Sequence, residues 1–464
     1  MIYRWPVQGS SRALALLVAG AFFMETLDFT IIAPAAPHIA ADLGVDPVSV
    51  TTAVTAYVLT LAVLLPVSGW LADRFGGRRV FAIALVVFTV ASALCALAPN
   101  LPVLVAARAL QGAGGALLVP VGRLVVLRAT AKTDLVRAIA YLTWPALVAP
   151  VFAPALGGFL ADHASWRWIF LINLPLGLVA LIVALRIVPD TVAAERAPLD
   201  RRGLVLTVLG VAGVVVGMEA LGSVAPRWPV AAAGLGIGAI ALVAAVRHLL
   251  RAEHPLVDLR VLRTPTLRLQ AAGGSVYRGS ILAIPFLVPL FLQLGFGWTA
   301  TAAGLAVVAV FVGNVGIKPV TTPLMRRFGI RTVLLGSVGA GIACVIALAF
   351  VQRDTPVPVL LGVLLAGGIF RSVGFTAFNS VAFADVPEGE MTHANTLVST
   401  LQELAVGIGV AAAALFVRIG ELVVPGAEGP FRVAFWLLAA LLMVPAYQSW
   451  RLARTAGDHI TGRA

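Results

Sequence analysis

The sequence predicts an all-α polytopic membrane protein with about fourteen transmembrane helices. Three observations support this fold class: 60% of the 464 residues are hydrophobic, only 12% are charged, and the apolar residues are gathered into long runs. Soluble domains carry about 25% charged residues, and a chain with half that share cannot cover a water-facing surface. We therefore expect most of the protein surface to face lipid.

The apolar runs define the individual helices, because each crossing of the hydrocarbon core needs about 20 helical residues. Runs of this kind, separated by short breaks with charged residues, Gly or Pro, predict helices at 13–40, 50–72, 79–98, 101–128, 137–160, 168–188, 203–222, 229–250, 265–294, 299–325, 331–352, 356–383, 393–417 and 430–451. We expect an N-terminal six-helix half (1–190), cytoplasmic linkers with two intervening helices (191–262) and a C-terminal six-helix half (263–464).

An internal repeat indicates that the two halves are related. Segment 70–80 (WLADRFGGRRV) resembles segment 323–333 (PLMRRFGIRTV), and each lies between the second and third helix of a six-helix block. The matching residues are Leu71, Arg74, Phe75, Gly76, Arg78 and Val80 in the first copy, and Leu324, Arg327, Phe328, Gly329, Arg331 and Val333 in the second. Duplicated halves are typical of transporters that rock about a central site.

The basic residues predict the orientation in the membrane. They gather in alternate connections between the helices, which is the positive-inside pattern, so the net charge of +12 does not indicate nucleic-acid binding. The pattern places both termini in the cytoplasm of a multi-pass protein of the bacterial inner membrane. Cys95 and Cys344 lie alone in apolar runs, which argues against a disulfide framework or a metal site.

Charged residues in the first and fourth predicted helices form a candidate proton-coupling site. Asp28 lies in the middle of the first helix, and Glu25 lies three residues earlier on the same face. Carboxylates in the membrane core are costly, and they commonly carry protons or pair with a cation. Arg108 in the fourth helix also needs partners; Asp28 is its candidate counter-ion, and Gln111 lies one turn away. A purely structural salt bridge is the alternative.

Basic residues in the C-terminal half form a candidate substrate site. Arg278, Lys318 and Arg371 lie inside predicted helices, and Arg123 could add a fourth charge. Gln111 and Glu403 are further candidates for substrate contact. Several cations around a cavity would repel a lipophilic cation and would suit a carboxylate or phosphate, which Arg binds in a bidentate way. Citrate, another polycarboxylate or a metal chelate of one would fit. The alternative is that Arg371 pairs with Glu403, while the other cations bond to carbonyls or extend to the interface.

Four motifs resemble those of the major facilitator superfamily, and specifically its fourteen-helix drug:proton antiporter family of the EmrB/QacA type. The resemblance covers essentially the whole chain and looks closest to the MdtD-type branch of multidrug exporters. The motifs are FMETLDFTIIAPAAPHIAADLG (23–44), GWLADRFGGRR (69–79), RALQGAGGALLVP (108–120), and APVFAPALGG (149–158), which is followed by WRWIFLINLPLG (166–177).

The resemblance implies roles for individual residues. It implies that Arg108 couples protonation to the conformational change. It also implies a gate latch, for which a simple topogenic cluster is the alternative, made by Asp73, Arg74, Gly76, Arg78 and Arg79. The helix-packing motif of antiporters is matched at Pro154, Gly157 and Gly158, whereas Ala149 and Ala153 stand where Gly is usual. These small residues still allow close packing.

The expected function is therefore proton-driven secondary active export by alternating access, of multiple drugs or other toxic compounds. The first alternative is export of an organic anion such as citrate or a metal–citrate chelate; the second is an importer or symporter of the same fold. The sequence has no nucleotide-binding motif and no catalytic constellation of a membrane enzyme, so no cofactor is expected. The expected partners are a small-molecule substrate, protons and the lipid bilayer. We expect a monomer, and the sequence does not indicate whether a periplasmic adaptor binds.

Overall fold

The computed structural model describes residues 9–130, 135–189, 198–222 and 227–453, and every regular element in these ranges is helical. In the described ranges, twelve helices are long and apolar enough to cross a membrane, or thirteen if one bent pair counts as a span. Both counts leave out helix α6 (Leu135–His163), some of whose side chains are not described. The all-α membrane fold is confirmed, while the count of fourteen stays a prediction.

The N-terminal group of helices packs around α1 and α5. Its members are α1 (Gly9–Leu43), α2 (Thr51–Leu64), α3 (Val67–Phe75), α4 (Gly77–Ala96), α5 (Leu101–Ala129), α6, α7 (Trp168–Leu171) and α8 (Asn173–Ile187). Helix α5 shows why these segments begin where they do. Asn100 accepts a hydrogen bond from the N–H of Val103 at 3.0 Å, which caps one of the four N–H groups that a helix start leaves unpaired, and Pro102 occupies the first turn.

The C-terminal group has the same general plan. Its members are α11 (Pro265–Leu269), α12 (Ser275–Leu290), α13 (Ala300–Gly316), α14 (Lys318–Phe328), α15 (Ile330–Ala349), α16 (Val357–Ala382), α17 (Met391–Val423) and α18 (Gly429–Arg451). Two π-helical turns, Gln270–Gly274 and Phe291–Gly295, flank α12. Irregular turns of this kind are frequent at functional sites.

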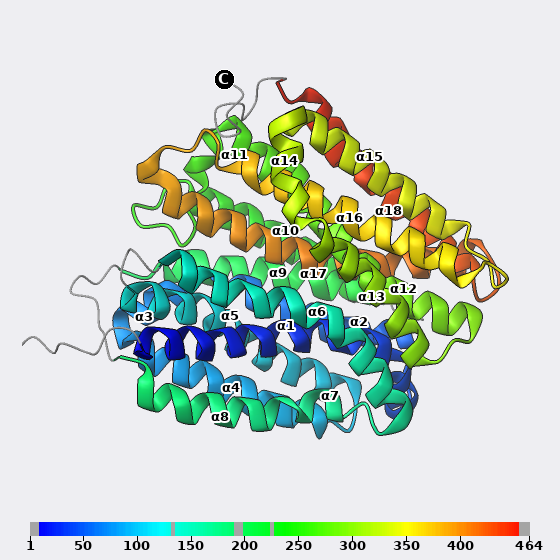
Figure 1. The fold of residues 1–464 in the computed structure, drawn as a ribbon, viewed down its shortest axis with the longest axis horizontal. Helices are drawn as coiled ribbons and strands as arrows, with labels where there is room; N and C mark the ends of the chain where they lie inside the picture. The colour runs from blue at the N-terminus through cyan, green and yellow to red at the C-terminus, as the bar shows by residue number, and fades with distance from the viewer. Residues whose placement is uncertain (1–8, 131–134, 190–197, 223–226, 454–464) are drawn as a thin grey trace, which may run out of the picture.

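Helices α9 (Arg201–Gly222) and α10 (Trp228–Leu249) form a hairpin between the two groups. Figure 1 shows the N-terminal group in the lower part of the view and most of the C-terminal group, coloured from yellow-green to red, above it. Helix α9 contacts α2 on one side and α17 on the other. The predicted boundary at residue 190 lies outside the described residues, and the boundary at 262 falls in the short helix Leu259–Arg263.

Asp200 joins the base of this hairpin to the following loop. Its carboxylate accepts hydrogen bonds from the N–H groups of Gly203 (2.8 Å) and Leu256 (3.1 Å), and it lies 2.7 Å from Nε2 of His248. Burial raises the pKa of Asp200, but the bonds to Gly203, His248 and Leu256 together lower it below its usual value. The carboxylate is thus held ionised where α9 begins and α10 ends.

The internal repeat is visible in the backbone. Gly76 and Gly329 both adopt positive φ, at 89° and 79°, at the turn before the third helix of each group. Only Gly adopts this region without strain. Arg78 donates to the carbonyl oxygen of Leu185 at the end of α8, and its counterpart Arg331 donates to that of Trp450 at the end of α18 (2.7 Å). The same loop-to-last-helix contact therefore occurs in both groups.

Several predicted helices are interrupted. The segment predicted as 168–188 is α7 and α8, which are separated at Ile172. The segment predicted as 50–72 is α2 and α3, which are separated at Leu65 and Pro66. The segment predicted as 299–325 is α13 and α14, which meet at an angle of 52°. Pro319 lies just after the break between α13 and α14, and proline cannot donate the hydrogen bond that would continue a helix. Lys318, predicted inside one long helix, is consequently the first residue of α14.

The interface between the two groups is closed at the end opposite the basic loops, which we call the far end. Asp162 of α6 accepts hydrogen bonds from the N–H groups of Ala300 (3.2 Å) and Thr301 (2.7 Å), where α13 begins. Gln293 donates to the carbonyl of Pro34 at 3.0 Å, and Arg418 pairs with Asp46 at 2.6 Å. These contacts hold the C-terminal group against α1, α6 and the loop before α2.

Candidate proton-coupling and substrate site

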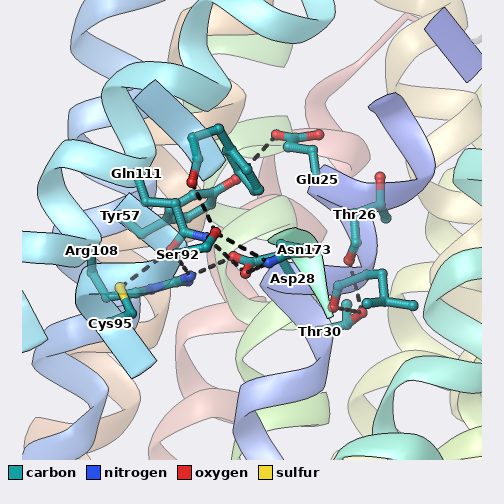
Figure 2. Close-up of polar contacts among 12 residues, drawn as sticks. Glu25, Thr26, Asp28, Thr30, Tyr57, Ser92, Cys95, Arg108, Gln111 and Asn173 are labelled. Carbon is teal, nitrogen blue, oxygen red and sulfur yellow. Dashed lines mark hydrogen bonds and ion pairs between the residues drawn. The ribbon is translucent and has the colours of Figure 1, made fainter. Parts of the chain in front are cut away.

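The centre of the N-terminal group contains a fully buried ion pair. Asp28 on α1 pairs with Arg108 on α5, and both side chains have 0% exposure. Gln111 Nε2 and Asn173 Nδ2 donate to the other carboxylate oxygen, Oδ1, at 2.8 and 2.7 Å. Figure 2 shows these side chains converging on Asp28 from α5 and α8. The charge of Asp28 is thus met by three donors, as a buried carboxylate requires.

Ser92 and Tyr57 complete this cluster. Ser92 accepts a hydrogen bond from Gln111 at 2.8 Å, and the ring centroid of Tyr57 lies 4.2 Å from the Arg108 guanidinium carbon. The cation is therefore placed over an aromatic face. Nη1 of Arg108 also donates to Oε1 of Gln111 at 2.7 Å, while its Nε and Nη2 have no hydrogen-bond partner among the described residues.

Glu25 lies at the edge of the cluster and is much less constrained. It is half-buried, and its one hydrogen bond to a described residue is a long contact of 3.5 Å from the Tyr57 hydroxyl. Glu25 also interacts electrostatically with Asp28 and with Glu403 on α17. Helix α1 thus carries two carboxylates, one held by three donors and one with a single long hydrogen bond.

Close helix packing brings the cluster together. A side chain at Gly112 of α5 would overlap the backbone of Tyr57 on α2, and one at Gly114 would overlap the backbone of Phe88 on α4. Glycine is needed here because the helices approach too closely for any Cβ. The glycines of RALQGAGG thus fix the distance from α5 to its two neighbours, while Arg108 and Gln111 point to Asp28.

The three predicted cations of the C-terminal group also come together. Arg278 on α12 and Arg371 on α16 each lie over a phenylalanine ring, at 4.5 Å from the centroid of Phe375 and 5.0 Å from that of Phe311. Lys318 donates to the Thr376 hydroxyl at 3.1 Å. Within the described ranges none of the three forms an ion pair, so the pairing of Arg371 with Glu403 is absent there. Glu403 instead acts electrostatically on Arg278.

Arg123 does not join these cations in the described structure. Its side chain is exposed on α5, whereas Arg371 is 5% exposed. A pocket of ≈ 30 Å³ lies between the two groups, and Phe29, Phe286 and Phe311 contribute three aromatic side chains to its wall. Phe311 lies between this central pocket and Arg371, so the cation cluster borders an aromatic cavity that both groups line.

The predicted latch residues lie at the basic end of the N-terminal group. Asp73 pairs at 2.7 Å with Arg128 at the end of α5, a partner that the sequence motif did not indicate. Arg74 and Arg79 are exposed, while Arg78 contacts α8 as described above. The latch therefore connects α3, α5 and α8 within one group.

We expect Asp73→Asn to slow transport several-fold while changing the free energy of unfolding by less than about 1 kcal/mol, because both partners are exposed. Transport by the purified protein and its thermal unfolding would measure the two effects separately. Arg128→Gln should reproduce both results. Full transport in both variants would contradict a role for this ion pair in gating.

The packing motif lies where α6 meets both α1 and α13. A Cβ at Gly157 would overlap the backbone of Ile31 on α1, and one at Gly158 would overlap that of Ala300 on α13. On the opposing helix, a Cβ at Gly304 would overlap the carbonyl of Pro154. Pro154 and Gly158 thus lie at a close contact between the two groups, while Gly157 packs α6 on α1 within the N-terminal group.

Sequence reasoning missed three members of the N-terminal cluster. Asn173, Ser92 and Tyr57 are ordinary polar residues in apolar segments, and their spacing reveals no common face because each comes from a different helix. The motif WRWIFLINLPLG contained the clue to Asn173, since an amide inside an apolar helix needs a partner. In the described ranges no group of three or more metal-ligating side chains is present.

Sequence and structure comparisons both find similarity to membrane transporters of one superfamily. The family model of the Major Facilitator Superfamily matches residues 18–410 and 271–454. A relative from Escherichia coli O6:H1, which bears the name multidrug resistance protein MdtD, is 36% identical over 452 residues that cover 94% of each chain. Two solved structures share the fold: an inward-facing, unoccupied bacterial homologue of the lysosomal transporter Spinster, and a D-xylose–proton symporter. The Spinster homologue has a TM-score of 0.67 and 14% sequence identity, and the match covers 97% of this chain and 98% of the other. The symporter has a TM-score of 0.66 and 15% sequence identity, and the match covers 96% of this chain and 98% of the other.

Proposed function

Because the chain belongs to the Major Facilitator Superfamily, we propose that this membrane transporter is a proton-driven exporter that works by alternating access. The observation that carries the proposal is the buried Asp28–Arg108 pair next to the less constrained Glu25. A transporter without a proton-linked step has no evident use for two carboxylates and an arginine in the membrane core, where each is costly. The basic loops favour cytoplasmic termini, which makes the far end the periplasmic side.

The proton would enter at Glu25 and act on Asp28. When Asp28 is ionised, it holds Arg108, Gln111 and Asn173 in place and joins α1 to α5 and α8. A proton on Asp28 removes the charge that stabilises Arg108, so Arg108 must find other partners. That change would release α1, which also contacts the C-terminal helices α12 and α13.

Alternating access would separate the far-end contacts. The capping of α13 by Asp162, the Arg418–Asp46 pair and the contact of Gly158 with α13 close the far end in this structure. Opening that side requires all of them to break, while the Asp73–Arg128 latch remains within one group. Protonation at Asp28 and opening at the far end are coupled because α1 and α6 pack on each other at Gly157.

Two substrate classes are supported by different observations. The aromatic side chains around the central pocket would contact an apolar molecule, and a drug-sized one requires the two groups to move apart, because the pocket has a volume of only ≈ 30 Å³. The MdtD relative is named for multidrug resistance. The cations Arg278, Lys318 and Arg371, none of which forms an ion pair with a described residue, favour an organic anion such as citrate or a metal–citrate chelate. An importer or symporter of the same fold would use the same groups with the opposite direction of net transport.

Proton flux in proteoliposomes with an imposed pH gradient distinguishes these substrates. We expect Arg278→Gln and Lys318→Gln to abolish proton flux driven by an anionic substrate, because the anion loses its counter-charges. Flux driven by a lipophilic cation dye should be unchanged or faster, because a repulsive charge is removed. The assay compares citrate, citrate with iron and the dye.

The control is Arg251→Gln, an exposed arginine in the loop after α10, which should leave all fluxes unchanged. If the dye alone dissipates the gradient in the unmodified protein, the cations are structural, and Glu25 with Asp28 becomes the drug site. If no compound of either class moves protons although the protein is folded, proton-driven export is wrong.

A further inference from the structure

A second pocket lies inside the C-terminal group, away from the proposed proton site. It has a cavity volume of ≈ 30 Å³, is enclosed by α12, α13, α15, α16 and α18, and is lined almost entirely by apolar side chains. Arg371 contributes the one charged side chain in its wall. Tyr277, also in the wall, already uses its hydroxyl to donate to the carbonyl of Phe370 at 3.1 Å.

This C-group pocket occupies the position that the Asp28–Arg108 cluster fills in the N-terminal group. The repeat that aligns Gly76 with Gly329 also aligns Phe88 with Gly341, Ser92 with Val345 and Cys95 with Leu348. Helices α5 and α16 both carry proline as their second residue, and this alignment puts Arg108 on Leu364 and Gln111 on Gly367. The counterparts Gly341, Val345, Leu348, Leu364 and Gly367 all line the pocket.

The structure supports this alignment independently. Gly112 of α5 packs against the backbone of Tyr57, and its counterpart Gly368 of α16 packs against the backbone of Val310, which is aligned with Tyr57. The helices of the two groups thus meet at equivalent points, but the side chains that fill the first group are missing from the second. Glycine in place of Phe88 and Gln111 leaves a narrow slot in the C-terminal group.

Arg371 gives this slot a chemical preference. It is 5% exposed, its Nη1 has no hydrogen-bond partner, and it forms no ion pair with any described residue. A buried cation without a counter-ion is costly, and Arg278 and Lys318 add to the positive potential around it. A carboxylate or phosphate would satisfy the guanidinium, and the narrow apolar slot of ≈ 30 Å³ would hold the part of an unbranched chain next to the head.

We infer that the C-group pocket binds an amphiphilic acid, with the acidic head on Arg371 and the apolar body between Gly341, Leu364 and Gly367. The head and tail chemistry is shared by a free alkyl carboxylate and by an anionic lipid. The site goes beyond the proposed transport, because it lies within one group of helices and its binding is measurable without a proton gradient.

The chain contains its own reporter for this site. It has two cysteines: Cys344 lines the pocket, and Cys95 is fully buried. The experiment measures the rate at which N-ethylmaleimide labels Cys344 in phosphatidylcholine nanodiscs at neutral pH, with Cys344→Ala as the blank. The ligands are octanoate, octylammonium with the same tail, and citrate with no tail; a fourth sample contains phosphatidylglycerol.

We expect octanoate at ten times its Kd to slow labelling about tenfold by mass action, and octylammonium and citrate to have no effect. Arg371→Gln should abolish the protection, while Arg251→Gln should retain it. Gly341→Phe, which restores the ring present at Phe88, should block labelling itself. Protection by phosphatidylglycerol would support the same site with a lipid as its occupant.

Equal protection by octanoate and octylammonium would overturn the inference, because charge would not matter. Protection by citrate would overturn it as well, because the apolar body would not matter. If Cys344 does not react, thermal unfolding in the same nanodiscs tests the binding of octanoate instead. Octanoate must then raise the Tm of the unmodified protein and leave the Tm of the Arg371→Gln variant unchanged. None of these results depends on whether the protein moves protons.

Discussion

Asp28→Asn should abolish proton-driven transport. The substitution keeps the size of the side chain but removes the charge that Arg108 faces, and both groups are fully buried. An amide cannot pair with the guanidinium as a carboxylate does, so the protein can no longer alternate between an ionised and a protonated state at this position. Substrate-dependent proton flux in proteoliposomes should fall to the level of protein-free vesicles.

The same substitution should also destabilise the protein, by about 3–5 kcal/mol, because it leaves Arg108 buried without a counter-ion. The double variant Asp28→Asn with Arg108→Gln separates the two effects. It removes the unpaired charge, so thermal stability should largely recover, whereas transport should remain absent. Recovery of transport together with stability would contradict a role of Asp28 in proton coupling and would leave the ion pair as a structural element.

The fold could be predicted from the sequence because the bilayer imposes a simple rule on it. Every crossing needs a long apolar helix, and such helices are visible in composition alone. The breaks at Leu65–Pro66 and at Ile317 could not be predicted this way, because hydrophobicity averaged over a window does not detect a short bend. Proline near both positions was the available signal, and proline is also tolerated inside membrane helices, as Pro34 and Pro37 of α1 demonstrate.

The candidate site was predictable only in part, for a different physical reason. A charge inside an apolar helix is visible in one sequence, so Asp28, Arg108, Arg278 and Arg371 could be identified. Their partners are set by helix packing: Asn173 reaches Asp28 from α8 and Arg128 reaches Asp73 from the end of α5. The C-group pocket could not be predicted for the same reason. Gly341 and Gly367 indicate a pocket only when they are compared with Phe88 and Gln111, their counterparts in the N-terminal group.

Gly158→Leu should hold the protein open at the far end and thereby stop transport. A side chain at this position would overlap the backbone of Ala300, where α6 packs on α13. Overpacking of this kind costs about 1–3 kcal/mol, and here the cost applies only to the state in which the two groups touch. The ratio of closed to open molecules should therefore fall by about 5- to 150-fold.

This shift is measurable with a cysteine in place of Thr30, which lines the central pocket, in a protein that carries Cys344→Ala. A membrane-impermeant maleimide added to the far side should label this cysteine much faster in the Gly158→Leu variant than in its parent. The matched control is Gly336→Leu on α15, because nothing lies within 4 Å of a Cβ at that position, and the same added side chain should leave labelling and transport unchanged. The added side chain would meet backbone atoms of Ala300 and Thr301, whose N–H groups donate to the Asp162 carboxylate, so the variant perturbs the α6–α13 contact and this cap together. Unchanged labelling would mean that α6 and α13 stay together throughout transport, and that the far end opens elsewhere along the interface.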